Sequence, residues 1–265
     1  RKRTMILDQF NLAGKVALVT GPGTGLGQAI ALALAEAGAD IVGVYRESFA
    51  ETQARVEALG RRWLPLPCDL AVATPVDLQE IVAQTVAALG RLDIVVNNAG
   101  IIRRAPAADY SEADWDAVMQ VNLKAAFFLS QAAARYFLAR ADVPPGRARG
   151  KIIHVASVLS CQGGILVAAY TASKSGLAGL TRLLANEWAA HGINVNALAP
   201  GYMVTRNTEP LRNDPQRNAA ILARIPAGRW GEPADLQGAA VFLASEASNY
   251  VHGALIPVDG GWLAR

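Results

Sequence analysis

The sequence predicts a single α/β domain with a doubly wound, seven-stranded parallel sheet and helices on both faces. Short runs of β-branched residues alternate with longer Ala- and Leu-rich stretches along the chain, which is typical of repeated strand–helix units. Several of these runs are apolar at consecutive positions, as expected for strands covered on both faces. A glycine-rich turn follows the first run, where such folds bind ligands.

The expected elements follow from this alternation. The first strand covers residues 16–20, and an apolar helix at 29–37 ends before Gly38, a helix-stop residue. Long helices are predicted at 122–139 and 171–191, and residues 141–150 read as a surface loop. The other strands are predicted at residues 41–45, 63–66, 92–96, 151–156, 193–198 and 254–258.

Residues 201–226 depart from the pattern. This segment contains Pro210, Pro215 and Pro226, several Asn and Arg residues, and only a weak helical pattern. A stretch of this kind within a compact domain predicts a mobile substrate lid. Because no linker or repeat interrupts the chain elsewhere, residues 1–265 are expected to form one domain.

Composition excludes several classes of protein. The 265 residues are 52% hydrophobic and 18% charged, which excludes a disordered chain. The 25 Lys and Arg and 22 Asp and Glu residues are scattered, so no nucleic-acid-binding surface is expected. No apolar stretch reaches the roughly 18–20 residues that a membrane helix requires, and Asp8 interrupts any export signal.

The cysteine and histidine residues indicate no metal site. Cys68 and Cys161 form no Cys-x-x-Cys pair, and the three histidines are far apart in the sequence. So few cysteines favour a reducing, cytoplasmic location.

The glycine-rich turn at residues 20–27, TGPGTGLG, lies between the first strand and the first helix. Missing side chains there let the backbone approach a pyrophosphate at a helix N-terminus. Glycines also form ordinary tight turns, but this strand–turn–helix context predicts dinucleotide binding.

The end of the second strand bears on the choice between NAD and NADP. Tyr45 stands where a carboxylate would select NAD, and the following Arg46 could pair with a 2′-phosphate. The adjacent Glu47 could instead accept from a ribose hydroxyl, and Arg46 could be a solvated charge. Both dinucleotides therefore stay open.

Tyr170 and Lys174 are four residues apart, so on a helix they face one site. A nearby ammonium would lower the pKa of the phenol and make it a usable acid or base, although this spacing is common by chance. Ser157 follows the predicted strand at 151–156 and could hold a substrate oxygen, with Ser160 as a competing candidate. Asn122 lies inside an apolar helical run and either serves the site or bonds to neighbouring backbone.

Taken together, these residues resemble the short-chain dehydrogenase/reductase family. The resemblance rests on the glycine turn, the NNAG at 97–100, Pro200-Gly201 and the residues above, in the family's order along essentially the whole chain. It implies a nicotinamide-dependent oxidoreductase with a catalytic tetrad of Asn122, Ser157, Tyr170 and Lys174. Asp69 is implied to meet the adenine, with an N-cap or turn role as the alternative. The residues expected to contact the dinucleotide are Gly21, Gly25, Leu26, Gly27, Arg46, Asp69, Leu70, Asn98, Ala99, Gly100, Tyr170, Lys174, Pro200, Gly201 and Thr205.

A closer resemblance is to a branch of the family that acts on deoxy sugar acids, carried by residues 102–104, 160–164, 185–188, 200–203, 224–231 and 258–265. It implies hydride transfer at a keto or hydroxyl group of such an acid, with NAD(H), in a homotetramer; Arg46 leaves NADP(H) open. The substrate carboxylate needs a cation, and the candidate substrate contacts are Arg103, Arg104, Gln162 and Arg206. For the arginines, a solvated charge or an intersubunit ion pair is the alternative.

Two other functions stay open at this point. The same chemistry on gluconate, 5-ketogluconate or a 3-oxoacyl thioester would use the same tetrad. A dinucleotide-binding sensor without turnover would share the fold, but it would have no need of Tyr170 and Lys174 at this spacing.

Overall fold

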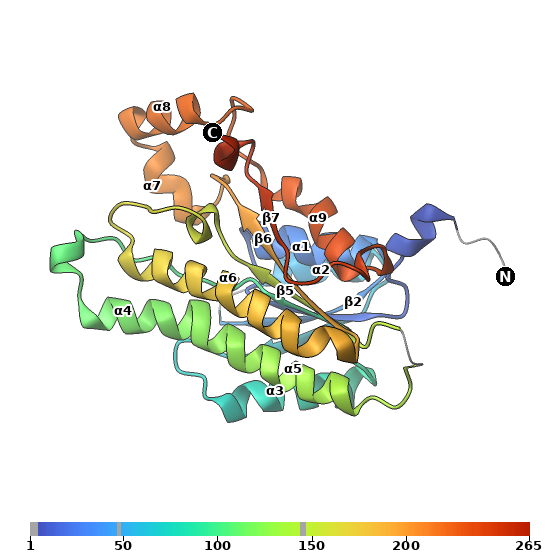
Figure 1. Cartoon of the computed structure of the whole chain (residues 1–265). Helices are drawn as coiled ribbons and strands as arrows, with labels where there is room; N and C mark the ends of the chain where they lie inside the picture. The colour runs from blue at the N-terminus through green and yellow to red at the C-terminus, as the bar shows by residue number, and fades with distance from the viewer. Residues whose placement is uncertain (1–4, 47–48, 144–146) are drawn as a thin grey trace.

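The computed structural model describes residues 5–46, 49–143 and 147–265. Across these residues, parallel strands form one seven-stranded sheet in the order β3-β2-β1-β4-β5-β6-β7 (Figure 1). The chain reverses its direction across the sheet between β1 and β4, and this switch point is where open α/β sheets bind ligands. The strands are β1 (Val16–Thr20), β2 (Asp40–Tyr45), β3 (Trp63–Pro67), β4 (Ile94–Asn97), β5 (Gly150–Val155), β6 (Ile193–Pro200) and β7 (Leu255–Val258).

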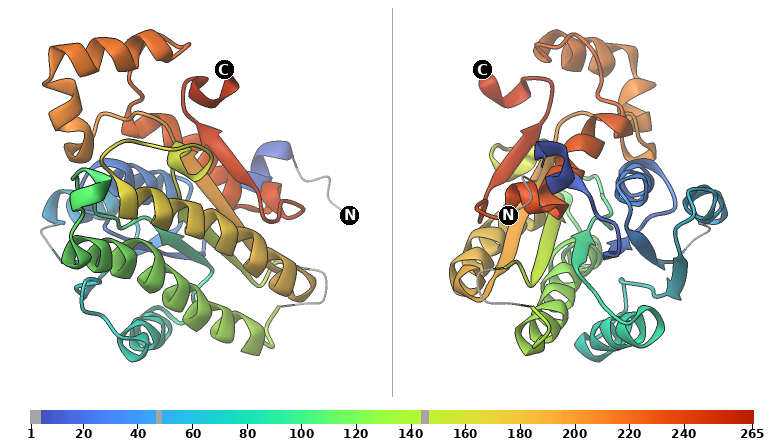
Figure 2. Two further views of the ribbon diagram at one scale, coloured as in Figure 1. Left: turned by 60° about the vertical axis from the view of Figure 1, so that its left-hand side comes forward. Right: turned by 90° about the vertical axis from the view of Figure 1, so that its right-hand side faces the viewer.

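Helices cover both faces of the sheet (Figure 2). One layer contains α1 (Gly25–Glu36), α2 (Ala50–Ala58) and α9 (Gln237–Ala244), with α1 packed against both others. The opposite layer contains α3 (Pro75–Leu89), α4 (Glu112–Met119), α5 (Ala125–Ala139) and α6 (Ala168–Trp188). The doubly wound fold predicted from the sequence is therefore confirmed.

The apolar runs in the strands supply two cores at once. In β1, Val16 and Leu18 pack toward α3, α5 and α6, whereas Ala17 and Val19 pack toward α1 and α9. All four are buried, and each buried side chain of the size of Val or Leu contributes roughly 1.5–3 kcal/mol relative to exposure. An alternating polar pattern would have left one face without a core.

Each predicted strand is present, and its ends differ from the prediction by at most two residues. The predicted first helix begins four residues late, because α1 already starts at Gly25, inside the glycine-rich turn. The predicted helix at 122–139 is the second part of a longer unit. A π-helical turn, Gln120–Lys124, joins α4 to α5.

Two of the three prolines of the 201–226 segment, Pro210 and Pro215, begin helices instead of preventing them. Pro210 lies in the first turn of α7 (Glu209–Arg212). Pro215 is the first residue of α8 (Pro215–Arg224), after the Asp214 cap. Proline is tolerated there because those N–H groups need no partner within the helix. The weak helical pattern expected for this segment is thus corrected to two short helices, which stand beyond the sheet in Figure 1.

A small third core holds α7 and α8 against the C-terminal residues. Trp262 is buried with Leu211, Ile221 and Ile225, and Val158 from the end of β5 joins the same cluster. Among the described residues, no helix is both long and apolar enough to cross a membrane.

Candidate active site

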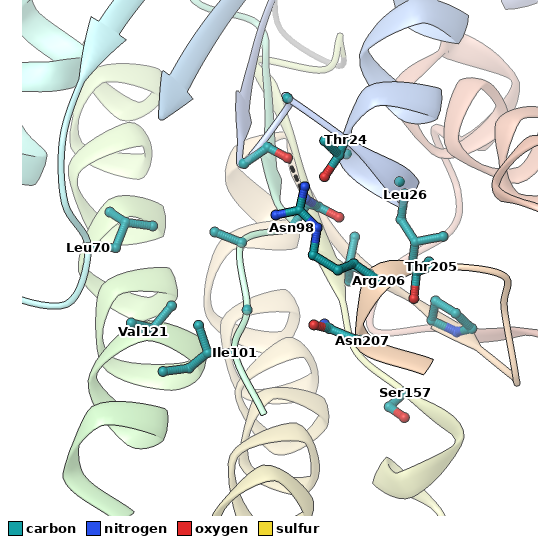
Figure 3. A pocket seen from close by; sticks show the side chains of 18 of the residues that line it. Thr24, Leu26, Leu70, Asn98, Ile101, Val121, Ser157, Thr205, Arg206 and Asn207 are labelled. Carbon is teal, nitrogen blue, oxygen red and sulfur yellow. Dashed lines mark hydrogen bonds between the residues drawn. The ribbon is translucent and has the colours of Figure 1, made fainter. Parts of the chain in front are cut away.

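A cleft of about 420 Å³ opens at the carboxyl ends of the central strands, a size typical of ligand and cofactor sites. Every residue that the sequence analysis expected to contact a dinucleotide lines this cleft. Figure 3 shows Ile101 and Val121 on one side of it and Thr205, Arg206 and Asn207 on the other.

The glycine-rich turn has the backbone conformation that its glycines allow. Gly21 and Gly25 have φ angles of 65° and 56°, which side-chain-bearing residues rarely adopt. A Cβ on Gly27 would lie 2.1 Å from the carbonyl oxygen of Gly21, so no larger residue fits. Thr24 at the N-cap of α1 makes no side-chain cap hydrogen bond. The turn and helix start thus fit a pyrophosphate group, which such N–H groups bind.

Asn98 holds this turn against the end of β4. Its backbone N–H and that of Ala99 donate to Oγ1 of Thr20, at 3.0 Å and 2.9 Å. Its Nδ2 atom donates to the carbonyl oxygens of Thr20 and Gly21, at 2.9 Å and 3.2 Å. Each such bond contributes roughly 0.5–1.5 kcal/mol. Asn98 lines the cleft, but its amide serves to shape the turn.

The adenosine end of the cleft is defined by the ends of β2 and β3. Tyr45 packs against Phe49, with ring centroids 4.1 Å apart, and Arg46 lines the cleft. Glu47, the competing ribose partner, lies outside the described residues. Asp69 lines the cleft and also accepts a 3.0 Å hydrogen bond from the N–H of Ala71. Asp69 therefore has the expected turn role and also lies in the cleft, and its contact with an adenine stays a prediction.

Ser157, Tyr170 and Lys174 lie together in the cleft, where β5 ends and α6 begins. The hydroxyl of Ser157 lies close enough to the phenol of Tyr170 to favour its ionised form. Ser160, the competing serine, points elsewhere, because its hydroxyl donates a 2.7 Å hydrogen bond to the carbonyl oxygen of Lys174. The structure therefore places Ser157, and not Ser160, beside the phenol.

Burial dominates the electrostatics of Tyr170. It raises the pKa of the phenol, against the opposing effects of the Ser157 hydrogen bond and the positive charge of Arg104. Burial also lowers the pKa of Lys174 to about 8. Lys174 Nζ lies 5.7 Å from the centre of the Tyr170 ring. The expectation that Lys174 lowers the pKa of Tyr170 is therefore wrong for this structure: Ser157 and Arg104 favour the phenolate, and burial outweighs both.

Asn122 lies in the π-helical turn between α4 and α5, a kind of bulge that is frequent at functional sites. Its Oδ1 atom accepts from the N–H of Ile101 at 2.8 Å. Its Nδ2 atom donates to the carbonyl oxygen of Ile101 at 3.0 Å and to Ser173 Oγ at 3.2 Å. A Cβ on Gly100 would lie 3.4 Å from Asn122 Oδ1 and 3.6 Å from Lys174 Nζ. Asn122 thus lies behind the residues that line the cleft. Its amide bonds to the backbone of Ile101, in agreement with the alternative that it bonds to neighbouring backbone.

The four candidate substrate residues have different surroundings. Arg103 is paired with Asp114 of α4, with Nε 3.3 Å from Oδ1. Arg104 donates from Nη2 to the carbonyl oxygen of Asn207 at 2.8 Å, whereas Arg206 lines the cleft itself. Gln162 Oε1 accepts a 3.1 Å hydrogen bond from Arg224 of α8.

Sequence reasoning missed Asn207 and Met203, which also line the cleft. Met203 lies in the 200–203 stretch that carries the closer resemblance, but nothing in the sequence gave either residue a role at the site, and the fold of the 201–226 segment brings both there.

Comparisons with known proteins place the chain among oxidoreductases. A sequence profile of the family described as enoyl-(acyl carrier protein) reductase matches residues 21–263. The chain is 59% identical over 261 residues to 2-dehydro-3-deoxy-D-gluconate 5-dehydrogenase of Escherichia coli, covering 98% of this chain and 100% of that protein. It is 54% identical over 259 residues to the enzyme of the same name from Bacillus subtilis, covering 97% and 98%. Gluconate 5-dehydrogenase of Gluconobacter oxydans is 43% identical over 260 residues, covering 96% of each chain.

Solved structures of sugar-acid dehydrogenases are also similar to this chain. A putative 2-deoxy-D-gluconate 3-dehydrogenase from Agrobacterium tumefaciens with bound NADP is 56% identical, with a TM-score of 0.88 and coverage of 97% of this chain and 100% of that one. A gluconate 5-dehydrogenase from Burkholderia cenocepacia in complex with NADP and tartrate is 40% identical, with a TM-score of 0.91 and coverage of 98% and 100%.

Proposed function

Because the chain belongs to the short-chain dehydrogenase/reductase family, we propose that it interconverts the C5 keto and hydroxyl groups of a deoxy sugar acid, as a 2-dehydro-3-deoxy-D-gluconate 5-dehydrogenase. It is an oxidoreductase that acts on CH–OH groups with a nicotinamide dinucleotide. The observation that carries the proposal is the meeting of Ser157, Tyr170 and Lys174 in one cleft with the glycine-rich turn. The identities above favour the deoxy sugar acid over other ketones.

The residues of the cleft fit a nicotinamide dinucleotide. The glycine-rich turn would hold the pyrophosphate, Asp69 and Leu70 the adenine, and Tyr170 and Lys174 the nicotinamide ribose. When bound, the dinucleotide supplies or accepts the hydride.

The chain's own groups would move the proton and orient the substrate. Tyr170 would donate its phenolic proton to the reacting oxygen on reduction and recover it on oxidation. Ser157, which lines the cleft with Tyr170, would hold that oxygen. Asn122 would act through the backbone of Ile101, which its amide holds, and so through the preceding Gly100, which lies beside Lys174. The 201–226 segment would close over the substrate, since Asn207 and Arg206 line the cleft from it.

We further propose that the enzyme accepts NADP(H) through Arg46. This residue lines the cleft, and Tyr45 before it carries no charge to repel a 2′-phosphate. Arg46→Ala should lower kcat/KM for NADPH about tenfold, because one charge-assisted hydrogen bond is lost. The value of kcat/KM for NADH should change much less. Equal losses with both dinucleotides would contradict a phosphate contact.

The experiment that tests the function follows the absorbance of reduced nicotinamide with 2,5-diketo-3-deoxy-D-gluconate, 5-ketogluconate and a 3-oxoacyl thioester in parallel. The proposal expects the deoxy acid to have the highest kcat/KM. Preference for another ketone would overturn the substrate assignment but keep the reaction class. If the protein binds the dinucleotide but turns over none of the three substrates, the result would favour a dinucleotide-binding sensor without catalytic activity.

We also propose that the protein is a cytoplasmic homotetramer. Large apolar side chains on the α4–α6 layer are partly exposed, with Trp115 at 40%, Leu138 at 43% and Leu183 at 48%. These helices lie side by side (Figure 1), and exposed apolar faces often mark interfaces. Light scattering coupled to gel filtration would give the mass of the assembly, and a monomer would exclude the proposal.

A further inference from the structure

Three side chains that can carry a positive charge line the cleft within the described part of the chain: Arg46, Lys174 and Arg206. Arg46 follows β2 at the adenosine end of the cleft. Lys174 is held at the Tyr170 end, where its Nζ atom donates to the carbonyl oxygen of Val155 at 2.6 Å. Arg206 enters the cleft from the 201–226 segment, and the proposed mechanism gives its charge no task.

Arg206 follows a residue that lies against the glycine-rich turn. A Cβ built on Gly25 would lie 3.6 Å from Cγ2 of Thr205, the residue before Arg206. Figure 3 shows the Arg206 side chain extending into the cleft on the side of Asn98, with Ser157 at a distance from its guanidinium. Arg206 is therefore placed at the glycine-rich turn and not where the substrate carbonyl would lie.

The backbone on both sides of Arg206 is held by side chains. Thr208 Oγ1 accepts from the N–H of Thr205 at 3.2 Å and donates to its carbonyl oxygen at 3.1 Å. Arg104 Nη2 donates to the carbonyl oxygen of Asn207 at 2.8 Å. Arg206 itself is exposed, so its guanidinium can reach a ligand while the turn that carries it stays in place.

The glycine-rich turn by itself offers no positive side chain. Residues 20–27 contain neither Lys nor Arg, so the turn can offer a ligand only backbone N–H groups, the Thr hydroxyls and the partial charge of a helix N-terminus. A dinucleotide carries a negative charge on each phosphate of its pyrophosphate. A guanidinium beside the turn would supply the full positive charge that the turn lacks.

We propose that Arg206 binds the pyrophosphate of the nicotinamide dinucleotide together with the glycine-rich turn. Its planar fork of N–H groups suits phosphate oxygens and keeps its charge at any working pH. The sequence-based expectation assigned Arg206 to the substrate, and the test below separates the two roles. The inference rests on the nicotinamide dinucleotide of the proposed function but not on the identity of the sugar acid.

The test uses Arg206→Met in the full chain and measures binding directly. The Kd values of NADH and NADPH follow from their fluorescence. Calorimetry gives the Kd of ADP-ribose, which has the pyrophosphate but no nicotinamide. At low ionic strength we expect all three Kd values to rise tenfold or more, because a charge-assisted hydrogen bond is lost and an exposed charge is least screened there. The KM of the sugar acid at saturating dinucleotide should change less than about threefold.

Three variants serve as controls. Arg206→Lys keeps the charge and should give a smaller loss, and it replaces the Met variant if that one fails to fold. Arg55→Met removes an exposed charge of α2 that pairs with Glu51, and it should change none of the Kd values. Arg46→Ala should weaken the binding of NADPH alone, so the two arginines of the cleft should give different patterns.

The outcomes separate this proposal from the proposed function. If no sugar acid is turned over but Arg206→Met still weakens the binding of both dinucleotides and of ADP-ribose, the pyrophosphate contact stands and only the substrate assignment fails. An unchanged Kd of ADP-ribose, a loss confined to NADPH, or a rise in the KM of the sugar acid alone would overturn the pyrophosphate contact. Absence of ADP-ribose binding by the wild type at millimolar concentration would also overturn it.

Discussion

Lys174 Nζ donates a 2.6 Å hydrogen bond to the carbonyl oxygen of Val155, the last residue of β5. This bond ties the helix that carries Tyr170 to the strand end that precedes Ser157. Among the described residues this carbonyl is the one hydrogen-bond partner of the buried ammonium, which is therefore poorly solvated, and its pKa falls to about 8. Lys174 is thus held in place before any ligand binds.

The first prediction concerns the phenol. Tyr170→Phe removes the only group in the proposed mechanism that transfers a proton, so kcat should fall by about 10²–10⁴-fold. Its ring keeps the packing, and we expect the Kd of the dinucleotide, measured by fluorescence, to stay within about threefold. A variant that retained most of its turnover would contradict the proposed mechanism.

The second prediction separates the two serines. The Ser157 hydroxyl lowers the pKa of Tyr170, so Ser157→Ala should raise the pKa of that phenol. The rising limb of kcat against pH for alcohol oxidation should then move to higher pH. Ser160→Ala is the matched control, because its hydroxyl bonds to the carbonyl oxygen of Lys174 and should leave the limb in place. Equal shifts in both variants would mean a general change at the site.

The third prediction distinguishes two adjacent arginines. Sequence alone made Arg103 and Arg104 equal candidates. Asp114 pairs with Arg103, whereas Arg104 donates to the carbonyl oxygen of Asn207, a residue that lines the cleft. Arg104→Ala should raise the KM of the sugar acid tenfold or more. Arg103→Ala should change it less than about threefold. Steady-state kinetics of both variants decide this, and a larger effect at Arg103 would reverse the assignment.

The fourth prediction rests on a buried polar network behind the site. His154 Nε2 lies 3.1 Å from Ser130 Oγ, and its Nδ1 lies 2.9 Å from Thr181 Oγ1. Ser130 also accepts from Asn97 Nδ2 at 3.0 Å. Burial, followed by the charge of Lys174, lowers the pKa of His154 to about 3. The imidazole therefore stays neutral in the folded protein and links β4, β5, α5 and α6.

Acid should weaken the fold through this residue. Between pH 6.5 and about 3, His154 is protonated in the unfolded chain but stays neutral in the folded protein. The free energy of unfolding therefore falls as the pH falls through this range. In His154→Leu this loss disappears, while Ser130 and Thr181 keep their bonds to the carbonyl oxygens one turn back. Urea unfolding at about pH 7.5 and about pH 4.5 should show the wild type losing about 2–3 kcal/mol more than the variant. An equal fall in the free energy of unfolding in the wild type and in His154→Leu would contradict a buried neutral imidazole.

Much of the fold and of the cleft follows from local patterns. Apolar runs between turn residues identified all seven strands, because a parallel strand covered on both faces must be apolar throughout. Carboxyl ends of parallel strands lie at one edge of the sheet, so the glycine turn, Asn98 and Ser157 had to meet there. Tyr170 and Lys174 then followed from their four-residue spacing on a helix.

Tertiary structure decided what depends on partners far along the chain. Arg103 forms an ion pair with Asp114. The hydroxyl of Ser160 donates to the carbonyl oxygen of Lys174, and the side-chain amide of Asn122 accepts from the N–H of Ile101. Sequence spacing determines which side chains share an element and a face. Burial and the pairing of charges depend on how the elements pack, and these set the pKa of Tyr170 and the availability of each arginine.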